Sequence, residues 1–334
     1  MTKVAKHMNK DKFAKKGGQF VTGFFRFALI ISLMYMILYP LLRMISNAFV
    51  HPHVLGSVSS LWIPERVTFD NFIVAFHLLN FVPTLIFTTA IMAGIMVLQL
   101  FNSAFAGYAF ARLKFRFMGI FFALVLITIV VPNQVLFLPQ FVMFGNFDVF
   151  GILALIGIGP LNLRGEPTVM FIMAGLGQGI AGGIFIYIFR QFFRGLPKEL
   201  EEAAYVDGAG VLRTFFTIAM PMAKPAILTV GTLSFIWNWN DGFFQSVFHP
   251  SDQYMRVRIN NLNAPGTGGV TIIQQNIEMM MGRLPNDIVT LTTPTYDALI
   301  VGVANLLSIL PLVFLFLIIQ RQFVQGVERS GIVG

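Results

Sequence analysis

Long apolar segments follow one another along almost the whole chain, and they restrict its fold more than any other feature. A helix needs about 20 apolar residues to cross the core of a bilayer. Only 11% of the residues are charged, whereas soluble domains carry about 25%. Backbone polar groups in lipid must be bonded within their own segment, so each apolar segment should be a helix. We therefore predict an all-α, polytopic membrane protein with six transmembrane helices, at residues 24–46, 83–111, 119–141, 169–193, 226–247 and 298–320.

These segments form one expected transmembrane domain, residues 24–320, because no polar linker is long enough to separate two folds. A basic tail precedes it (1–23) and a short tail follows it (321–334). A long outer loop is expected at residues 248–297. A further apolar stretch, Val149 to Leu161, is too short to cross a bilayer and should lie at the interface or re-enter it.

The distribution of basic residues predicts the orientation. Cytoplasmic loops of membrane proteins are enriched in Lys and Arg. Of the 23 Lys and Arg residues, 17 lie between residue 3 and residue 26 or in residues 112–118, 190–225 and 321–334. The exceptions are Arg43, Arg66, Arg164, Arg256, Arg258 and Arg283. We predict a multi-pass protein of the cell (inner) membrane with both termini cytoplasmic. Because topology explains the net charge of +8, membrane lipid is the expected partner and nucleic acid is not.

Several kinds of chemistry have no residues to support them. The chain has no cysteine, and no Gly-Lys dipeptide of the kind a Walker loop requires. Its five histidines show no metal-ligand spacing, with His51 and His53 the nearest approach, and no catalytic carboxylate pair occurs within the spans. We therefore expect no catalytic residue, no metal and no cofactor, and predict that the chain is not an enzyme.

The longest predicted cytoplasmic loop, residues 195–225, indicates two short helices joined by a hinge. Pro197 suits the first turn of a helix, where its missing N–H has no partner to lose. Gly208 is placed to end that helix, and it should need a positive φ. The second helix should carry Val211, Phe215, Ile218 and Met222 on one face, until Pro221 and Pro225 interrupt it.

The first of these helices can be interpreted as a protein-docking helix or as an amphipathic helix on the membrane surface. It is too polar to enter the bilayer, and its face of Leu200, Ala203 and Ala204 is narrow and small. Small side chains let a helix sit deep in a groove of another protein. Anionic lipid headgroups would repel its acidic residues Glu199, Glu201, Glu202 and Asp207. A protein partner is therefore favoured.

The same loop carries the spacing of a known family. The sequence Glu202-Ala203-Ala204, three residues, Gly208, nine residues and Ile218-x-Met220-Pro221 resembles the EAA motif of ABC importer permeases. "YAFARLKF" at 108–115, "PNQVLFLP" at 132–139, "WNWNDGFF" at 237–244 and "QRQFVQG" at 320–326 resemble further signatures of its sugar, maltose-type branch. The segment 149–168 and the outer loop are longer than is usual in that family.

The resemblance implies a MetI-like permease core that imports a carbohydrate, such as an oligosaccharide. It also implies three kinds of partner: a second homologous permease subunit, cytoplasmic ATPase subunits, and an extracellular or periplasmic sugar-binding protein. The ATPase-coupling residues that it implies are Glu202, Ala203, Ala204, Asp207, Gly208, Ile218 and Pro221.

The fifth predicted span holds the densest set of polar residues, which are costly at membrane depth unless they face a cavity or a partner helix. On one helix, Ser234, Asn238, Asp241 and Gln245 form a continuous polar stripe, beside Trp237, Asn240 and Phe244. Aromatic faces and amides suit sugar rings and hydroxyls, so these residues are candidates for the substrate pathway. The stripe could equally bond helix to helix. Asn133 and Gln134 could line the same cavity or repair the kink at Pro132.

Three alternative functions compete with this interpretation, and the EAA spacing argues against the last two. An importer permease for a non-sugar solute, such as a polyamine or phosphate, could carry a related loop. A secondary transporter would need ionisable residues at depth and an inverted repeat, and only Asp241 and Asp297 qualify as ionisable. A membrane scaffold would have no use for an ATPase-docking helix.

Overall fold

The computed structural model describes residues 2–52, 66–148, 151–262, 271–279 and 294–331, together with residues 64 and 264. The chain divides into two compact units, residues 1–75 with 277–306 and residues 76–276 with 307–334. In the described residues every regular element is a helix, and two isolated β-bridges join Val50 to Val67 and Phe147 to Leu161. The expected all-α fold is confirmed for this part of the chain.

The first unit is built on α1 (Thr2–Ala48) and the start of α2 (Asp70–Leu78). Asn71 connects the two helices. Its buried side chain donates hydrogen bonds to the carbonyls of Ala48 and Val50, at 3.0 and 2.9 Å. Asn71 therefore satisfies carbonyls that the end of α1 would otherwise leave unpaired.

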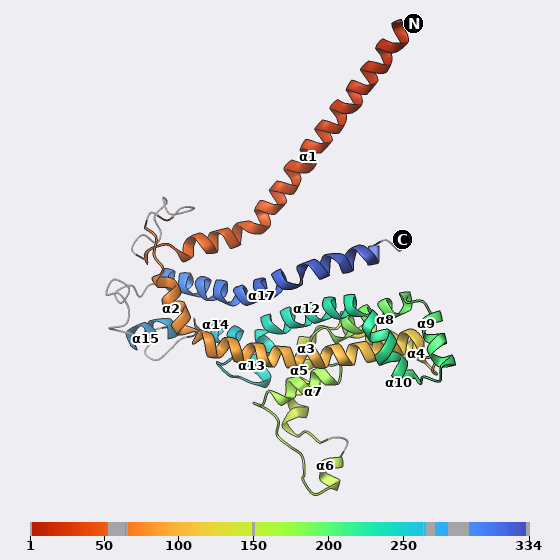
Figure 1. The fold of residues 1–334 in the computed structure, drawn as a ribbon. Coiled ribbons are helices and arrows are strands. Elements are labelled where there is room, and N and C mark those ends of the chain that lie inside the picture. The colour runs from red at the N-terminus through yellow and green to blue at the C-terminus, as the bar shows by residue number, and fades with distance from the viewer. Residues whose placement is uncertain are drawn as a thin grey trace. The chain divides into compact units, whose positions relative to one another are not determined.

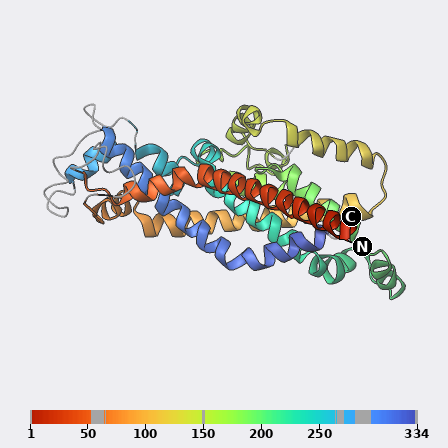
Figure 2. The same ribbon diagram turned by 90° about the horizontal axis from the view of Figure 1, so that it is seen from above.

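The second unit is organised around α3 (Phe81–Arg112), which packs against α8 (Gly182–Gly195), α12 (Lys224–Asn240) and α7 (Thr168–Gly175). The path of α3 beside α12 can be followed in Figures 1 and 2. Thr88, Gln99 and Ser103 are polar residues of α3 that are buried, and glycine at position 107 leaves room for α8, whose backbone at Arg190 would meet an added Cβ at 2.9 Å.

Three of the six predicted spans are single long helices. Residues 22–48 of α1, all of α3 and residues 295–321 of α17 (Pro294–Gly331) are long and apolar enough to cross a membrane. They coincide with the predicted spans 24–46, 83–111 and 298–320. The number of spans reaches five if two bent helix pairs are counted as one span each. The predicted count of six is not confirmed.

Both bent pairs have a proline near the break. The predicted span 119–141 consists of α4 (Met118–Val130) and α5 (Asn133–Gly145), bent by 104° around Val131 and Pro132. A residue before proline is disfavoured in the helical region, and Val131 has an extended backbone with ψ of 119°. The other pair joins residues 211–222 to α12 with a bend of 78° between Pro221 and Pro225.

The predicted fourth span, 169–193, is wrong as a continuous helix. It is split into α7 and α8 by residues 176–181, where Gly177 and Ala181 have positive φ. The sequence Leu-Gly-Gln-Gly-Ile-Ala contains two glycines, which lower the helix propensity and allow the chain to reverse locally. Unwound backbone at membrane depth is tolerated where it is buried in protein or lines a cavity.

The predicted span 226–247 also ends early. α12 stops at Asn240, and α13 (Gly242–Phe248) begins after Asp241. In the described part of the short apolar stretch, residues 151–161, the helix is α6 (Ile152–Leu155), in keeping with the stretch being too short to cross. The outer loop includes α14 (Met255–Leu262) and α15 (Ile272–Met279), while its residues 265–270 and 280–293 lie outside the described residues.

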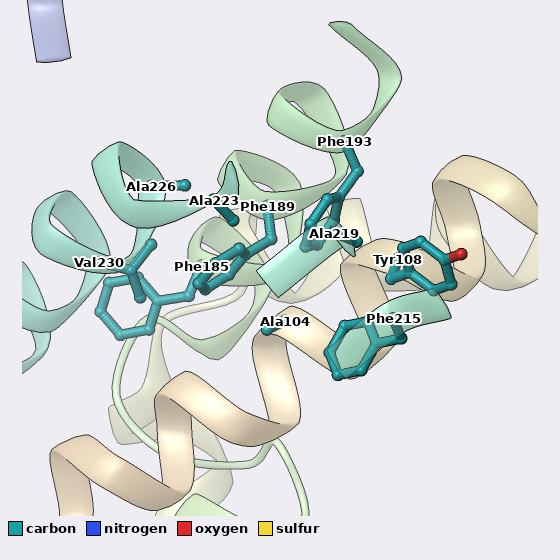
Figure 3. Packing of buried hydrophobic residues seen from close by; sticks show 10 residues of the cluster. All are labelled: Ala104, Tyr108, Phe185, Phe189, Phe193, Phe215, Ala219, Ala223, Ala226 and Val230. Carbon is teal, nitrogen blue, oxygen red and sulfur yellow. The ribbon is translucent and has the colours of Figure 1, made fainter. Parts of the chain in front are cut away.

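The core of the second unit gathers aromatic rings from α8 with small residues from its neighbours. Figure 3 shows the ring of Phe193 of α8 on the side of Tyr108 of α3, and the ring of Phe185 beside Val230. Phe189 and Ala104 belong to the same cluster. The same cluster includes Phe215, Ala219, Ala223, Ala226 and Val230. Alanines on α3 and α12 leave the space that the phenylalanine rings fill, so these helices approach closely.

Candidate functional site

The predicted coupling loop folds as α9 (Glu199–Val206), α10 (Val211–Thr214), the π-helix η3 (Phe215–Ala219) and α11 (Met220–Met222). α9 ends as expected. Gly208 has a φ of 80°, its N–H donates to the Tyr205 carbonyl, and the Ala209 N–H donates to Ala204 at 2.9 Å. This pair of hydrogen bonds is the Schellman arrangement, which favours glycine at this position.

The turn between α9 and α10 presents apolar side chains on its surface. Val206 is 88% exposed and Leu212 is 61% exposed, on either side of the exposed Gly208. Glu202, Ala203 and Asp207 are exposed as well, and Ala204 is partly exposed. An apolar patch rimmed by acidic side chains is typical of a protein-binding surface.

The second half of the loop differs from the predicted amphipathic helix. The π-helical turn changes the spacing of side chains, so Phe215 is buried whereas Val211 and Met222 are exposed. Ile218 is partly buried and Pro221 is exposed. The prediction that all four apolar residues share one face is therefore wrong.

One residue that sequence reasoning did not single out anchors this loop. Glu201 is buried, and its carboxylate forms an ion pair with Arg112 at 2.8 Å between Oε1 and Nε. The Tyr108 hydroxyl donates to Glu201 Oε2 at 3.3 Å. Tyr108 and Arg112 are one turn apart at the end of a span in the segment "YAFARLKF", and that spacing was the available signal.

The polar residues of the fifth predicted span mostly bond helix to helix. Gln99 of α3 accepts hydrogen bonds from Ser234 and from Asn238, at 2.5 and 3.0 Å, and donates to the Ile180 carbonyl at 3.1 Å. The Gln245 side chain donates to the Asn238 carbonyl at 2.8 Å. Three members of the predicted stripe are thus joined in a buried network.

Asp241 has a local structural role. Its Oδ1 accepts hydrogen bonds from the backbone N–H groups of Phe243 and Phe244, at 3.1 and 3.3 Å, at the start of α13. The chain turns at this residue, so the predicted continuous stripe is interrupted here. Asn240 is exposed and donates to the Ile236 carbonyl of its own helix.

A cavity of about 330 Å³ lies where the fourth span is broken. Trp237, Asn133 and Gln140 line it, together with residues 177–184 and parts of α4 and α5. One face of Trp237 stacks on Phe185, with 5.5 Å between ring centroids and 17° between planes. Gln134, a predicted pathway residue, is exposed and is not among the lining residues.

This cavity combines an aromatic ring with polar groups. Gln140 Oε1 is buried without a hydrogen-bond partner, which leaves an acceptor available to a bound molecule. Gln178 also lines the cavity, and none of the described lining residues is ionisable. A smaller space of about 30 Å³, bordered by Asn238, Asp241 and Gln245, is large enough for a water molecule.

Among the described residues, no group of three His, Cys, Asp or Glu could hold a metal ion. The candidate site has two parts: the exposed loop at residues 195–225, which is suited to a protein partner, and an uncharged cavity in the helical core.

Comparison with known proteins identifies the family of the chain. A model of the "binding-protein-dependent transport system inner membrane component" family matches residues 102–329, which include α9 to α12 and the cavity residues. The chain belongs to this family. It is therefore an inner-membrane permease subunit of a binding-protein-dependent ABC importer, and not a catalytic enzyme.

Curated relatives cover most of the chain. An arabinooligosaccharide transport system permease protein of Halalkalibacterium halodurans is 29% identical over 302 residues, 89% of this chain and 91% of the relative. The melibiose, raffinose and stachyose import permease protein of Bacillus subtilis is 27% identical, over 84% of this chain and 86% of that one. An sn-glycerol-3-phosphate transport system permease protein of Yersinia enterocolitica is 25% identical, over 84% and 81%.

A solved structure has the same fold. A chain of a bacterial ABC transporter involved in import of the acidic polysaccharide alginate superposes with a TM-score of 0.64 at 18% identity. The match covers 91% of this permease and 96% of the solved chain. At this identity the likeness supports the fold.

Proposed function

We propose that this permease pairs with a second permease subunit and with two cytoplasmic ATPase subunits to import a neutral carbohydrate. An external sugar-binding protein would deliver the cargo. Both termini and the loop 195–225 lie in the cytoplasm in this proposal, within the domain limits predicted above.

The observation that carries the ATPase assignment is the exposed apolar turn of Val206 and Leu212 around Gly208. Burying these side chains against a partner would be favourable by about 25 cal/mol for each Å² of apolar surface. The acidic first turn of α9 makes a membrane surface an unfavourable alternative. Glu202, Ala203, Ala204 and Asp207 would border the contact, while Ile218 and Pro221 would shape the second half of the loop.

The cavity beside the broken span supports a neutral cargo. Arg and Lys side chains are the common partners of phosphate esters in proteins, and the described residues that line the cavity include neither. The aromatic ring of Trp237, which borders the cavity, suits the C–H face of a sugar ring, and Asn133, Gln140 and Gln178 suit its hydroxyl groups. This argues for a carbohydrate over the glycerol phosphate named for one relative.

A charge placed in the exposed turn tests the docking assignment. Leu212→Glu should leave the permease in the membrane but reduce co-purification of the ATPase by tenfold or more, because a carboxylate would be buried unpaired at the contact. Leu155→Glu is a matched control, since Leu155 is also apolar and 85% exposed but lies in the stretch 149–161, on the outer side of the predicted topology. Equal ATPase recovery from both variants would refute this assignment.

A further inference from the structure

The buried carboxylate of Glu201 is unusual for α9, a helix whose other acidic residues are exposed. Glu201 is 6% exposed, whereas Glu199 and Glu202 face solvent. Its two oxygens accept from Arg112 and Tyr108, both in the last turns of α3. A buried charge is stable only where it is paired and hydrogen-bonded, so this geometry fixes α9 against the end of α3.

Arg112 extends the connection to a third helix. Its Nη2 donates to the Leu196 carbonyl at 2.7 Å, directly after the last residue of α8. The guanidinium group therefore joins α3, the end of α8 and α9 through one planar group. Both members of the ion pair are buried, with side chains 6% and 8% exposed, so solvent screens the interaction weakly.

A second contact attaches the other half of the loop to the same place. The Phe215 ring lies 5.1 Å from Tyr108 and 4.6 Å from Phe105, between ring centroids. Figure 3 shows Phe215 and Tyr108 facing each other beside Phe193. Both halves of the loop are thus fixed to α3, while Val206 and Leu212 remain exposed between them.

At membrane depth, α3 contacts the edge of the cavity. Gln99 donates to the carbonyl of Ile180, in the unwound segment that lines the cavity, and binds Ser234 and Asn238 of α12. The helix α3 therefore contacts the docking loop (residues 195–225) at its end and the edge of the cavity near its middle. This continuity is a physical route by which movement at the loop could reach the cargo.

We propose that Glu201 is a positioning residue whose ion pair with Arg112 makes the docking loop and the end of α3 move as one rigid body. The proposal rests on the proposed function, because the movement would come from the ATPase. Glu201 touches neither nucleotide nor cargo in this account; it transmits displacement to α3. In the alternative, the pair opens in every transport cycle.

A cysteine bridge separates these possibilities, and the chain contains no cysteine of its own. In a complex with cysteine-free partners, Arg112→Cys with Glu201→Cys should lower uptake per ATP hydrolysed by tenfold or more while the ATPase still co-purifies. Joining the two thiols with a short bifunctional reagent should restore at least half of the coupling. Uptake that stays low after bridging would favour an opening pair and overturn the proposal.

A milder variant covers the case in which the double variant does not assemble. Glu201→Gln keeps the shape but removes the charge, and it should lower the ratio of uptake to ATP hydrolysis at least threefold. Glu199→Gln, on the exposed side of the same helix, should leave the ratio unchanged. An unchanged ratio in Glu201→Gln would refute the rigid connection between the loop and α3 but leave the proposed function standing. Failure of the wild-type permease to retain the ATPase would instead refute the proposed function.

Discussion

Gly208 occupies a backbone conformation that suits glycine. Its φ of 80° is in the left-handed region, and a Cβ built on it would meet no atom within 4 Å. Strain in the backbone, and not a clash, should therefore decide the effect of a substitution. A β-branched residue there would be strained by about 1–3 kcal/mol, whereas asparagine tolerates the left-handed region.

Gly208→Val should therefore distort the end of α9 and reduce ATP-driven uptake by about tenfold, while Gly208→Asn retains most of it. Uptake by membrane vesicles, compared at equal permease content, measures the effect. Equal uptake by the valine and wild-type proteins would show that this turn does not transmit the movement.

Gly208 could be predicted from the sequence, but Glu201 could not. A glycine at the end of a helix signals its conformation locally, through residues one turn away. The partner of Glu201 is 89 residues distant in the chain, so its burial depends on how α3 and α9 pack. The sequence showed four acidic residues in one short segment, with nothing local to distinguish the buried one.

At the scale of helices, the sequence predicted where apolar segments lie but not where they break. The segment 169–193 is apolar enough for a span, yet its backbone unwinds at residues 176–181. The carbonyl of Ile180 finds its partner in Gln99 on another helix, and this tertiary contact supports the break. The predicted stripe of the fifth span is interrupted at Asp241, where a side-chain cap starts a new helix, although Ser234, Asn238 and Gln245 still share one hydrogen-bond network.

The break at Asp241 assigns different roles to two residues that share one sequence motif. Asp241 caps α13, so Asp241→Ala should lower the stability of the complex by about 0.5–2 kcal/mol. Surviving complexes should transport normally, and Asp241→Asn, which keeps an acceptor, should recover most of the stability.

Trp237→Ala should show the opposite pattern, since Trp237 lines the cavity. We expect uptake to fall about tenfold, a change of about 1.4 kcal/mol, with binding-protein affinity unchanged. Trp237→Phe is the matched control because it keeps an aromatic face. Melting temperature and uptake measured on one set of complexes distinguish the two residues, and normal uptake by Trp237→Ala would exclude it from the pathway.

At the scale of the whole molecule, family membership agrees with the all-α fold, while the orientation and the number of spans remain predictions. Hydropathy does not determine which side of the membrane a loop faces. The distribution of Lys and Arg does, and it predicts that the loop with Val206 is inside and residues near Glu166 are outside.

Single cysteines test that orientation cleanly in a chain without native cysteine. Glu166→Cys should react with an impermeant thiol reagent in intact cells, and Val206→Cys only after permeabilisation. Both positions are exposed, so access to the membrane side decides the labelling. Labelling of Val206→Cys in intact cells would show that this loop faces outside, and it would contradict the proposal that the loop binds a cytoplasmic ATPase.

The most direct test of the account is uptake by the purified complex in proteoliposomes. With ATP on the ATPase side and loaded binding protein on the other, we predict accumulation of a neutral oligosaccharide, and no ATP hydrolysis by this permease alone. Omission of either ATP or the binding protein should abolish uptake. Accumulation driven by an ion gradient without ATP, or transport by this chain alone, would contradict its assignment as the permease of an ATP-driven importer.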